Sequence, residues 1–144
     1  MSGFTILKAK ILLKCPVDSA IDRGLRLLTS DDPTTFDNEI SDLPDHPFWQ
    51  SSAYFMLQGR LAYDGRSVVV DAKIKNKNDE LDNLLLWLTP SIEQLEDGSW
   101  YNEDGLDDEP LELSFACETG KFLLRGPDYE RELATELWRP TATP

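Results

Sequence analysis

Apolar and polar residues alternate regularly near the start of the chain. One face of residues 4–14 carries apolar side chains at alternate positions, namely Leu7, Ala9, Ile11 and Leu13. Lysines occupy the opposite face of the same segment. A period of two predicts a half-exposed β-strand, which Pro16 ends.

A helical spacing follows this strand. The apolar residues of segment 19–28 recur every three or four positions, as Ile21, Leu25 and Leu28. Asp18 or Ser19 stands at the position of the helix cap. Gly24 lies inside the helix, where glycine costs about 1 kcal/mol relative to alanine. Residues 30–47 hold three prolines and no regular period, so they predict a long loop, and such loops are often functional.

The middle of the chain predicts a hairpin and a second helix. Residues 51–61 and 66–75 are rich in strand-forming side chains and flank an Asp-Gly turn at 63–66, which is a good hairpin signal. Leucines at helical spacing follow in residues 79–88, and Pro90 ends this helix. Its expected cap is Asn78 or Asp79.

The last part of the chain predicts another hairpin and a third helix. Residues 111–117 and 121–125 flank a turn with Gly120, and residues 128–138 are expected to be helical with Leu133 and Leu137 inside. The order β-α-β-β-α-β-β matches a split βαβ arrangement. We therefore expect one acidic α+β domain over residues 1–144, a mostly antiparallel sheet with two or three helices on one face.

Length and composition fit this expectation. A chain of 144 residues has the size of one domain, and 40% apolar and 28% charged residues are ordinary values. No apolar run approaches the roughly 20 residues of a membrane-spanning helix. The start of the chain lacks the pattern of a secretory leader. Cys15 and Cys117 do not imply a disulfide framework, although one bridge is open if their strands are neighbours, and a reduced cytoplasmic protein is expected.

The net charge of −13 is unevenly distributed. Residues 1–30 and 51–77 each have a net charge of +3, whereas residues 31–50 hold six acidic side chains and no basic one. Residues 78–118, here named the acidic block, hold thirteen acidic side chains and no basic one. Such a charge repels nucleic acid and anionic membranes and attracts basic partners.

Two interpretations of the acidic block are open. Runs of charge are usually solvated loops that keep a protein in solution. However, Trp100 and Tyr101 lie inside the block, and aromatic residues are favoured at interface centres. Like charges also repel one another unless basic groups relieve them. Both features favour a partner-binding surface composed of Glu96, Asp97, Trp100, Tyr101, Glu103, Asp104, Asp107 and Asp108.

Motifs for catalysis or cofactor binding are absent from the sequence. The only histidine, His46, lies in the predicted loop, where a solvated or capping role is expected. No nucleophile elbow or phosphate-binding loop is present. Residues 97–108 fail as a calcium loop because Asn102 stands at the glycine position and Asp108 at the glutamate position. One histidine and two distant cysteines do not predict zinc. We therefore expect no cofactor and no metal.

Residues 46–92 carry a further pattern. The segment begins His-Pro-Phe-Trp-Gln-Ser-Ser-Ala-Tyr-Phe, continues through the Asp-Gly hairpin to Ile-Lys-Asn-Lys-Asn-Asp-Glu-Leu at 74–81, and ends with Leu-Leu-Trp-Leu-Thr-Pro-Ser-Ile at 85–92. This part, about a third of the chain, resembles small uncharacterised bacterial proteins, some of them similar to immunity proteins of polymorphic toxin systems. Those proteins tend to continue with Gly-x-x-Arg-Tyr-Glu-Glu, whereas residues 98–104 lack the arginine. The resemblance implies an inhibitor and no catalytic residue.

Several functions are compatible with these features. The first is a non-enzymatic inhibitor or immunity-type protein that covers the active site of a basic protein, such as a nuclease toxin. The second is a phage-type anti-defence protein whose carboxylates imitate the phosphates of nucleic acid. The third is a small hydrolase that uses acidic residues around His46. The last is an acidic scaffold or adaptor subunit that assembles through its apolar sheet face and Trp49 or Trp87.

Overall fold

The computed structural model describes residues 4–29, 46–50, 57, 59–75, 79–103, 109–127, 129–133 and 139–140. In chain order the elements are β1 (Thr5–Leu13), α1 (Ser19–Leu28), α3 (Pro47–Gln50), β2 (Leu61–Tyr63), β3 (Ser67–Ile74), α5 (Glu80–Leu88), the 3-10 turn η2 (Thr89–Ser91), β4 (Ile92–Asn102), β5 (Leu111–Ala116), β6 (Lys121–Arg125), β7 (Tyr129–Glu132) and β8 (Arg139–Pro140). None of the helices in this part of the chain is long and apolar enough to cross a membrane.

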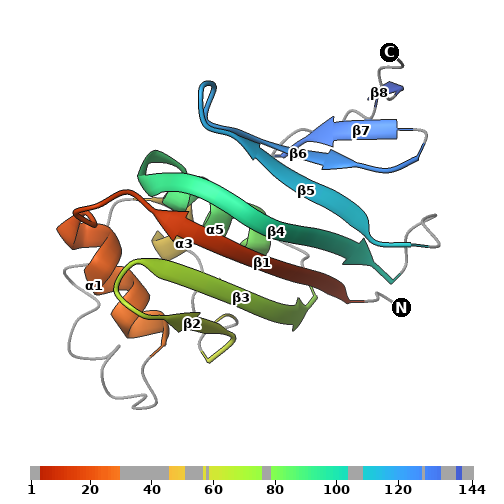
Figure 1. The fold of residues 1–144 in the computed structure, drawn as a ribbon. Helices are drawn as coiled ribbons and strands as arrows, with labels where there is room; N and C mark the ends of the chain where they lie inside the picture. Colours follow the sequence, from red (N-terminus) through yellow and green to blue (C-terminus); the bar gives the residue numbers. More distant parts are fainter. Residues whose placement is uncertain are drawn as a thin grey trace.

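The strands form one sheet in the order β2-β3-β1-β4-β5-β6-β7-β8, with the helices on one side of it (Figure 1). Every described strand pair is antiparallel. Because β3 and β4 both run opposite to β1, they run in the same direction, and α5 connects them. This β3-α5-β4 unit around β1 is a split βαβ arrangement. The predicted α+β class is therefore confirmed.

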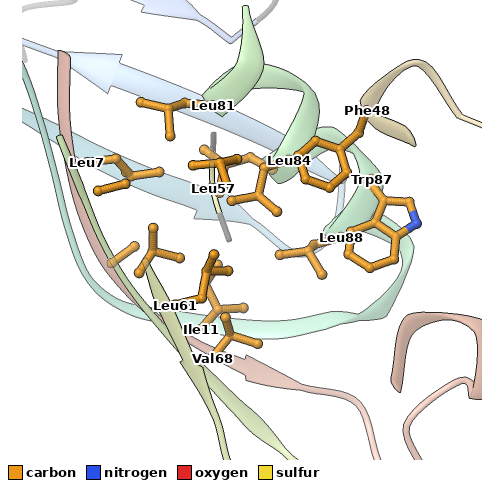
Figure 2. Packing of buried hydrophobic residues seen from close by; sticks show 14 of the residues in the cluster. Leu7, Ile11, Phe48, Leu57, Leu61, Val68, Leu81, Leu84, Trp87 and Leu88 are labelled. Carbon is orange, nitrogen blue, oxygen red and sulfur yellow. The ribbon is translucent and has the colours of Figure 1, made fainter. Parts of the chain in front are cut away.

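The core lies between the sheet and the helices (Figure 2). Leu7 and Ile11 of β1 face Leu84 and Leu88 of α5, and all four side chains are fully buried. Their exclusion from water is the main stabilising contribution, at about 2 kcal/mol for each large apolar side chain. The alternation predicted for β1 is thus confirmed, with lysines exposed on the face away from the helices.

An aromatic cluster joins helices α1, α3 and α5. Trp87 of α5 stacks on Phe48 of α3 at a ring-centroid distance of 5.7 Å and meets Trp49 edge-on at 5.1 Å. Gly24 of α1 faces both tryptophan rings so closely that a Cβ atom there would lie 2.6 Å from Trp87 and 2.8 Å from Trp49. The glycine that weakens the helix locally therefore permits the close approach of α1 to the cluster.

Helix α1 begins at the predicted cap residue, and a contact that was not predicted joins it to β2. The side chain of Asp18 caps it by accepting hydrogen bonds from the backbone N–H groups of Ala20 and Ile21, at 3.0 and 3.3 Å. One turn further, Asp22 accepts a hydrogen bond from the Tyr63 hydroxyl of β2. Burial and this hydrogen bond raise the pKa of Tyr63 to about 12, and the same bond lowers the pKa of Asp22. This hydrogen bond connects α1 to β2, the edge strand of the sheet.

The central hairpin forms at the predicted turn, but its first strand is shorter than expected. Asp64 accepts hydrogen bonds from the N–H groups of Arg66 and Ser67, which lowers its pKa to about 2, and Gly65 supplies a backbone φ of 100°. Strand β2 starts only at Leu61, whereas Leu57 is helical and residues 59–60 form a turn. The prediction of a strand over 51–61 is therefore wrong at residues 57, 59 and 60 and holds at Leu61, while residues 51–56 and 58 lie outside the described residues.

The predicted N-cap position of α5 is confirmed, but the side chain there does not cap the helix. Asp79 occupies the N-cap position in a left-handed conformation (φ 58°), and its side chain makes no capping hydrogen bond. Its carbonyl oxygen instead accepts the N–H of Asn83 at 2.9 Å. The α-helix ends at Leu88, before Pro90 as predicted, and the 3-10 turn η2 follows it directly.

Strands β4, β7 and β8 were not predicted. Strand β4 lies in the middle of the acidic block, where the sequence predicted no helix or strand. Residues 129–132 form β7 and pair with β6, so the prediction of a helix over 128–138 is wrong there. A four-residue run is too short for its period to separate helix from strand, and pairing with β6 decides the outcome. Leu133 is buried, as expected.

Candidate functional site

The predicted surface residues on β4 divide between the two faces of the sheet. Trp100 is opposite Leu7 on the side of the helices, and it is only 1% exposed. Its proposed role as an exposed anchor is therefore wrong, because the indole fills the core. Tyr101 is opposite Ile6 on the other side and is half-buried. Asp104, Asp107 and Asp108 lie outside the described residues.

Shifts in strand register turn several acidic side chains away from the helices. Between Lys10 and Ile11 the register of β1 with β4 shifts and leaves Glu96 without a partner residue, and a second shift leaves out Glu93. Such extra residues bend a strand and redirect its side chains, as in β-bulges. Glu96 and Asp97 are consequently both exposed although they are adjacent in the sequence.

Basic side chains of neighbouring strands neutralise part of the acidic block. Glu96 pairs with Lys10 of β1 at 3.4 Å, and Glu103 pairs with Lys73 of β3 at 3.5 Å. Glu93 pairs with Arg66 of the β2–β3 turn at 3.1 Å. Each exposed pair contributes about 1 kcal/mol or less. Together they relieve within the chain some of the repulsion that had favoured a basic partner.

The described part of the chain is close to neutral. It contains 13 Lys and Arg against 16 Asp and Glu, a net charge of −3, whereas the residues outside it hold 11 acidic side chains and Lys77, a net charge of −10. Most of the net charge of −13 therefore belongs to residues whose placement is not described. The face of the sheet away from the helices carries charges of both signs.

This outer face of the sheet contains a hollow of about 400 Å³ that is open to solvent. The hollow spans β3, β1 and β4 and is lined by Lys8, Ala9, Lys10, Val69, Val70, Asp71, Asp97, Gly98 and Ser99. Lys8, Asp71 and Asp97 are exposed, and none of them makes an ion pair with another described residue. Val69 beside them is a large apolar side chain that is nevertheless 43% exposed.

An exposed aromatic residue extends the outer face toward the start of β1. Phe4 is 37% exposed, with the ammonium groups of Lys73 and Lys75 at 5.2 and 5.7 Å from its ring centroid. Its backbone N–H donates to a carboxylate oxygen of Glu103 at 3.2 Å. Neither Phe4 nor Val69 was predicted as a surface residue. The sequence could have indicated them, because each is an apolar residue at a strand position where the alternation of apolar and polar residues predicts an exposed side chain.

His46, around which a hydrolase site was considered, has a structural role. His46 precedes α3, and its Nδ1 accepts the backbone N–H of Phe48 at 3.2 Å. Partial burial lowers the pKa of His46, and a neutral ring is what this hydrogen bond requires. The expected capping role is confirmed. In the described ranges no group of three His, Cys, Asp or Glu side chains is placed to hold a metal ion.

The residues proposed for scaffold assembly are not on the surface. Trp49 and Trp87 are each 5% exposed because they pack in the aromatic cluster. The cysteines do not form the disulfide that had been left open, since Cys15 and Cys117 are both free and exposed.

Comparison of the chain with protein families, curated proteins and solved structures finds no match. The candidate site therefore depends on its own geometry and chemistry.

Proposed function

We propose that this protein is a non-enzymatic inhibitor, of the immunity type, that binds a protein partner through the outer face of its sheet. The observation that carries the proposal is the hollow over β3, β1 and β4, in which Lys8, Asp71 and Asp97 lie exposed without an ion pair among the described residues. Charged side chains without an internal partner can pair across an interface, where complementarity sets specificity. The exposed Val69 of β3 adds apolar area to the hollow.

A basic protein is the partner that the net charge favours. A charge of −13 steers basic proteins toward the chain over distances set by salt screening. The resemblance of residues 46–92 to immunity proteins is the reason for preferring a toxin, such as a nuclease. The free, exposed cysteines agree with the reducing cytoplasm in which such an inhibitor acts.

Imitation of nucleic acid is less well supported by the same surface. Lysines already neutralise Glu96 and Glu103, which were expected to stand in for phosphates. A phosphate-like row needs carboxylates that are free of such partners.

Affinity capture from the native cell lysate, with the partner identified by mass spectrometry, tests the proposal. The wild-type chain is compared with Asp71→Lys/Asp97→Lys, which reverses two charges in the hollow, and with Glu109→Lys/Glu118→Lys. The second variant has the same net charge and changes exposed positions away from the hollow. We expect one basic protein to be captured by the wild type and by the control but not by the hollow variant. Equal capture by all three would reject the hollow as the binding surface.

A further inference from the structure

The charges of the hollow that make no ion pair with another described residue have a defined spacing. Lys8 of β1 lies directly opposite Asp71 of β3, and Lys10 lies directly opposite Asp97 of β4. Asp71 and Asp97 are thus two strand spacings apart and two residues apart along the strand direction. With strands about 4.8 Å apart and a rise of about 3.3 Å per residue, their backbone positions are about 12 Å apart.

Two lysines of β1, Lys8 and Lys10, lie between these two carboxylates. Lys8 is one strand from Asp71 and diagonal to Asp97, at roughly 8 Å between backbone positions. Lys10, the other cation of the hollow, is already engaged by Glu96. The groups that are open to a ligand are therefore two anions about 12 Å apart with one cation between them.

We infer that the hollow binds an extended partner segment that presents one carboxylate between two basic side chains. In an extended peptide alternate side chains share a face, so residues i, i+2 and i+4 span about 13 Å. A basic-x-acidic-x-basic sequence then places one cation near each of Asp71 and Asp97 and its carboxylate near Lys8. Each exposed charge of the hollow gains an opposite charge, and Val69 contacts the methylene stems of the basic side chains.

The inference rests on the proposed function and specifies the chemistry of its partner. It is also consistent with a partner that is basic as a whole, because the recognised segment carries a net charge of +1. The reversed pattern, acidic-x-basic-x-acidic, would bring like charges together at all three positions. Like-charge contacts oppose binding, so the order of charges decides recognition.

Short peptides test this order of charges directly. The ¹⁵N-labelled protein is titrated at low salt with the capped peptide Arg-Ser-Glu-Ser-Arg, with its scrambled form Arg-Arg-Ser-Glu-Ser, and with the reversed Glu-Ser-Arg-Ser-Glu. The scrambled peptide has the same net charge, so it controls for general attraction to an acidic protein. We expect the first peptide to shift the amide signals of Lys8, Asp71 and Asp97 with at least tenfold tighter binding than the other two.

A charge-swapped protein provides the complementary measurement. The variant Lys8→Glu/Asp71→Lys/Asp97→Lys is expected to prefer the reversed peptide by a similar factor, with its folded state checked by the same spectra. Equal binding of all peptides, or no shift up to about 10 mM peptide, would overturn the inference. The proposed function would still stand if capture of the partner depended on Asp71 and Asp97. The proposed function would be rejected, independently of the peptide result, if the wild type and the Asp71→Lys/Asp97→Lys variant captured the partner equally well.

Discussion

Replacing Gly24 with alanine separates helix propensity from packing. Gly24 lies in the middle of α1, and alanine there should stabilise an isolated helix by about 1 kcal/mol. In the folded protein the added Cβ would lie 2.6 and 2.7 Å from Trp87 ring carbons and 2.8 Å from a Trp49 ring carbon. Carbon atoms in contact are normally about 3.5–4.0 Å apart, so both rings must move by about 1 Å.

The rings have little room to move. Trp87 is confined by Phe48 on one face and by Trp49 at its edge. Overpacking of a core costs about 1–3 kcal/mol, and contact with two rings places Gly24→Ala in the upper part of that range. After subtraction of the gain in helix propensity, we expect the variant to be less stable by about 1–2 kcal/mol.

Urea unfolding followed by tryptophan fluorescence measures this difference. Ala20→Gly is the matched control, because Ala20 is exposed in the first turn of the same helix and reports propensity without packing. We expect both variants to be destabilised, although the two substitutions exchange the same residues in opposite directions. A Gly24→Ala protein as stable as the wild type, or more stable, would refute the packing of α1 against Trp49 and Trp87.

Three further substitutions test local contacts. His46→Asn keeps a side-chain oxygen that can accept the capping hydrogen bond but does not titrate. The pKa of His46 is lower in the folded protein than in the unfolded chain, so the unfolded chain takes up a proton first as the pH falls. The wild type should therefore lose stability relative to the variant as the pH falls from about 7 through 6.5 and below. Parallel pH profiles in urea unfolding would contradict this. Tyr63→Phe should lower the free energy of unfolding by about 1 kcal/mol at neutral pH and let the pKa of Asp22 rise. The loss of stability should become smaller once acid protonates Asp22. An unchanged titration of the Asp22 carboxyl group, followed by NMR, would exclude the hydrogen bond. Glu96→Gln should change the free energy of unfolding by less than about 1 kcal/mol, and a larger loss would show that its pair with Lys10 matters more than exposed pairs usually do.

Elements with one buried face could be predicted because burial imposes a clear period. In β1 and β3 every second side chain is buried, and in α1 the buried positions recur at helical spacing. Strand β4 lacks such a period. Its extra residues Glu93 and Glu96 interrupt the alternation, so its inward-facing positions are unevenly spaced and its charge resembles that of a loop.

The candidate site could be predicted only in part from the sequence. The exposed positions of Glu96 and Asp97 follow from their charge, but the lysines that surround them come from β1, at the other end of the chain. Strand order brings these segments together, and no local pattern encodes it. The burial of Trp100 has the same origin, since its position opposite Leu7 and Leu111 places the indole on the helix side.

Site-specific photo-crosslinking in the native cell tests the outer face as the binding surface most directly. A photoreactive amino acid replaces Val69, which is exposed in the hollow, or, as a control, Glu118, which is exposed in the β5–β6 turn. We expect a covalent adduct with one basic protein from position 69 and none from position 118. An adduct from position 118 alone, or equal adducts from both positions, would contradict the assignment of the partner to the outer face.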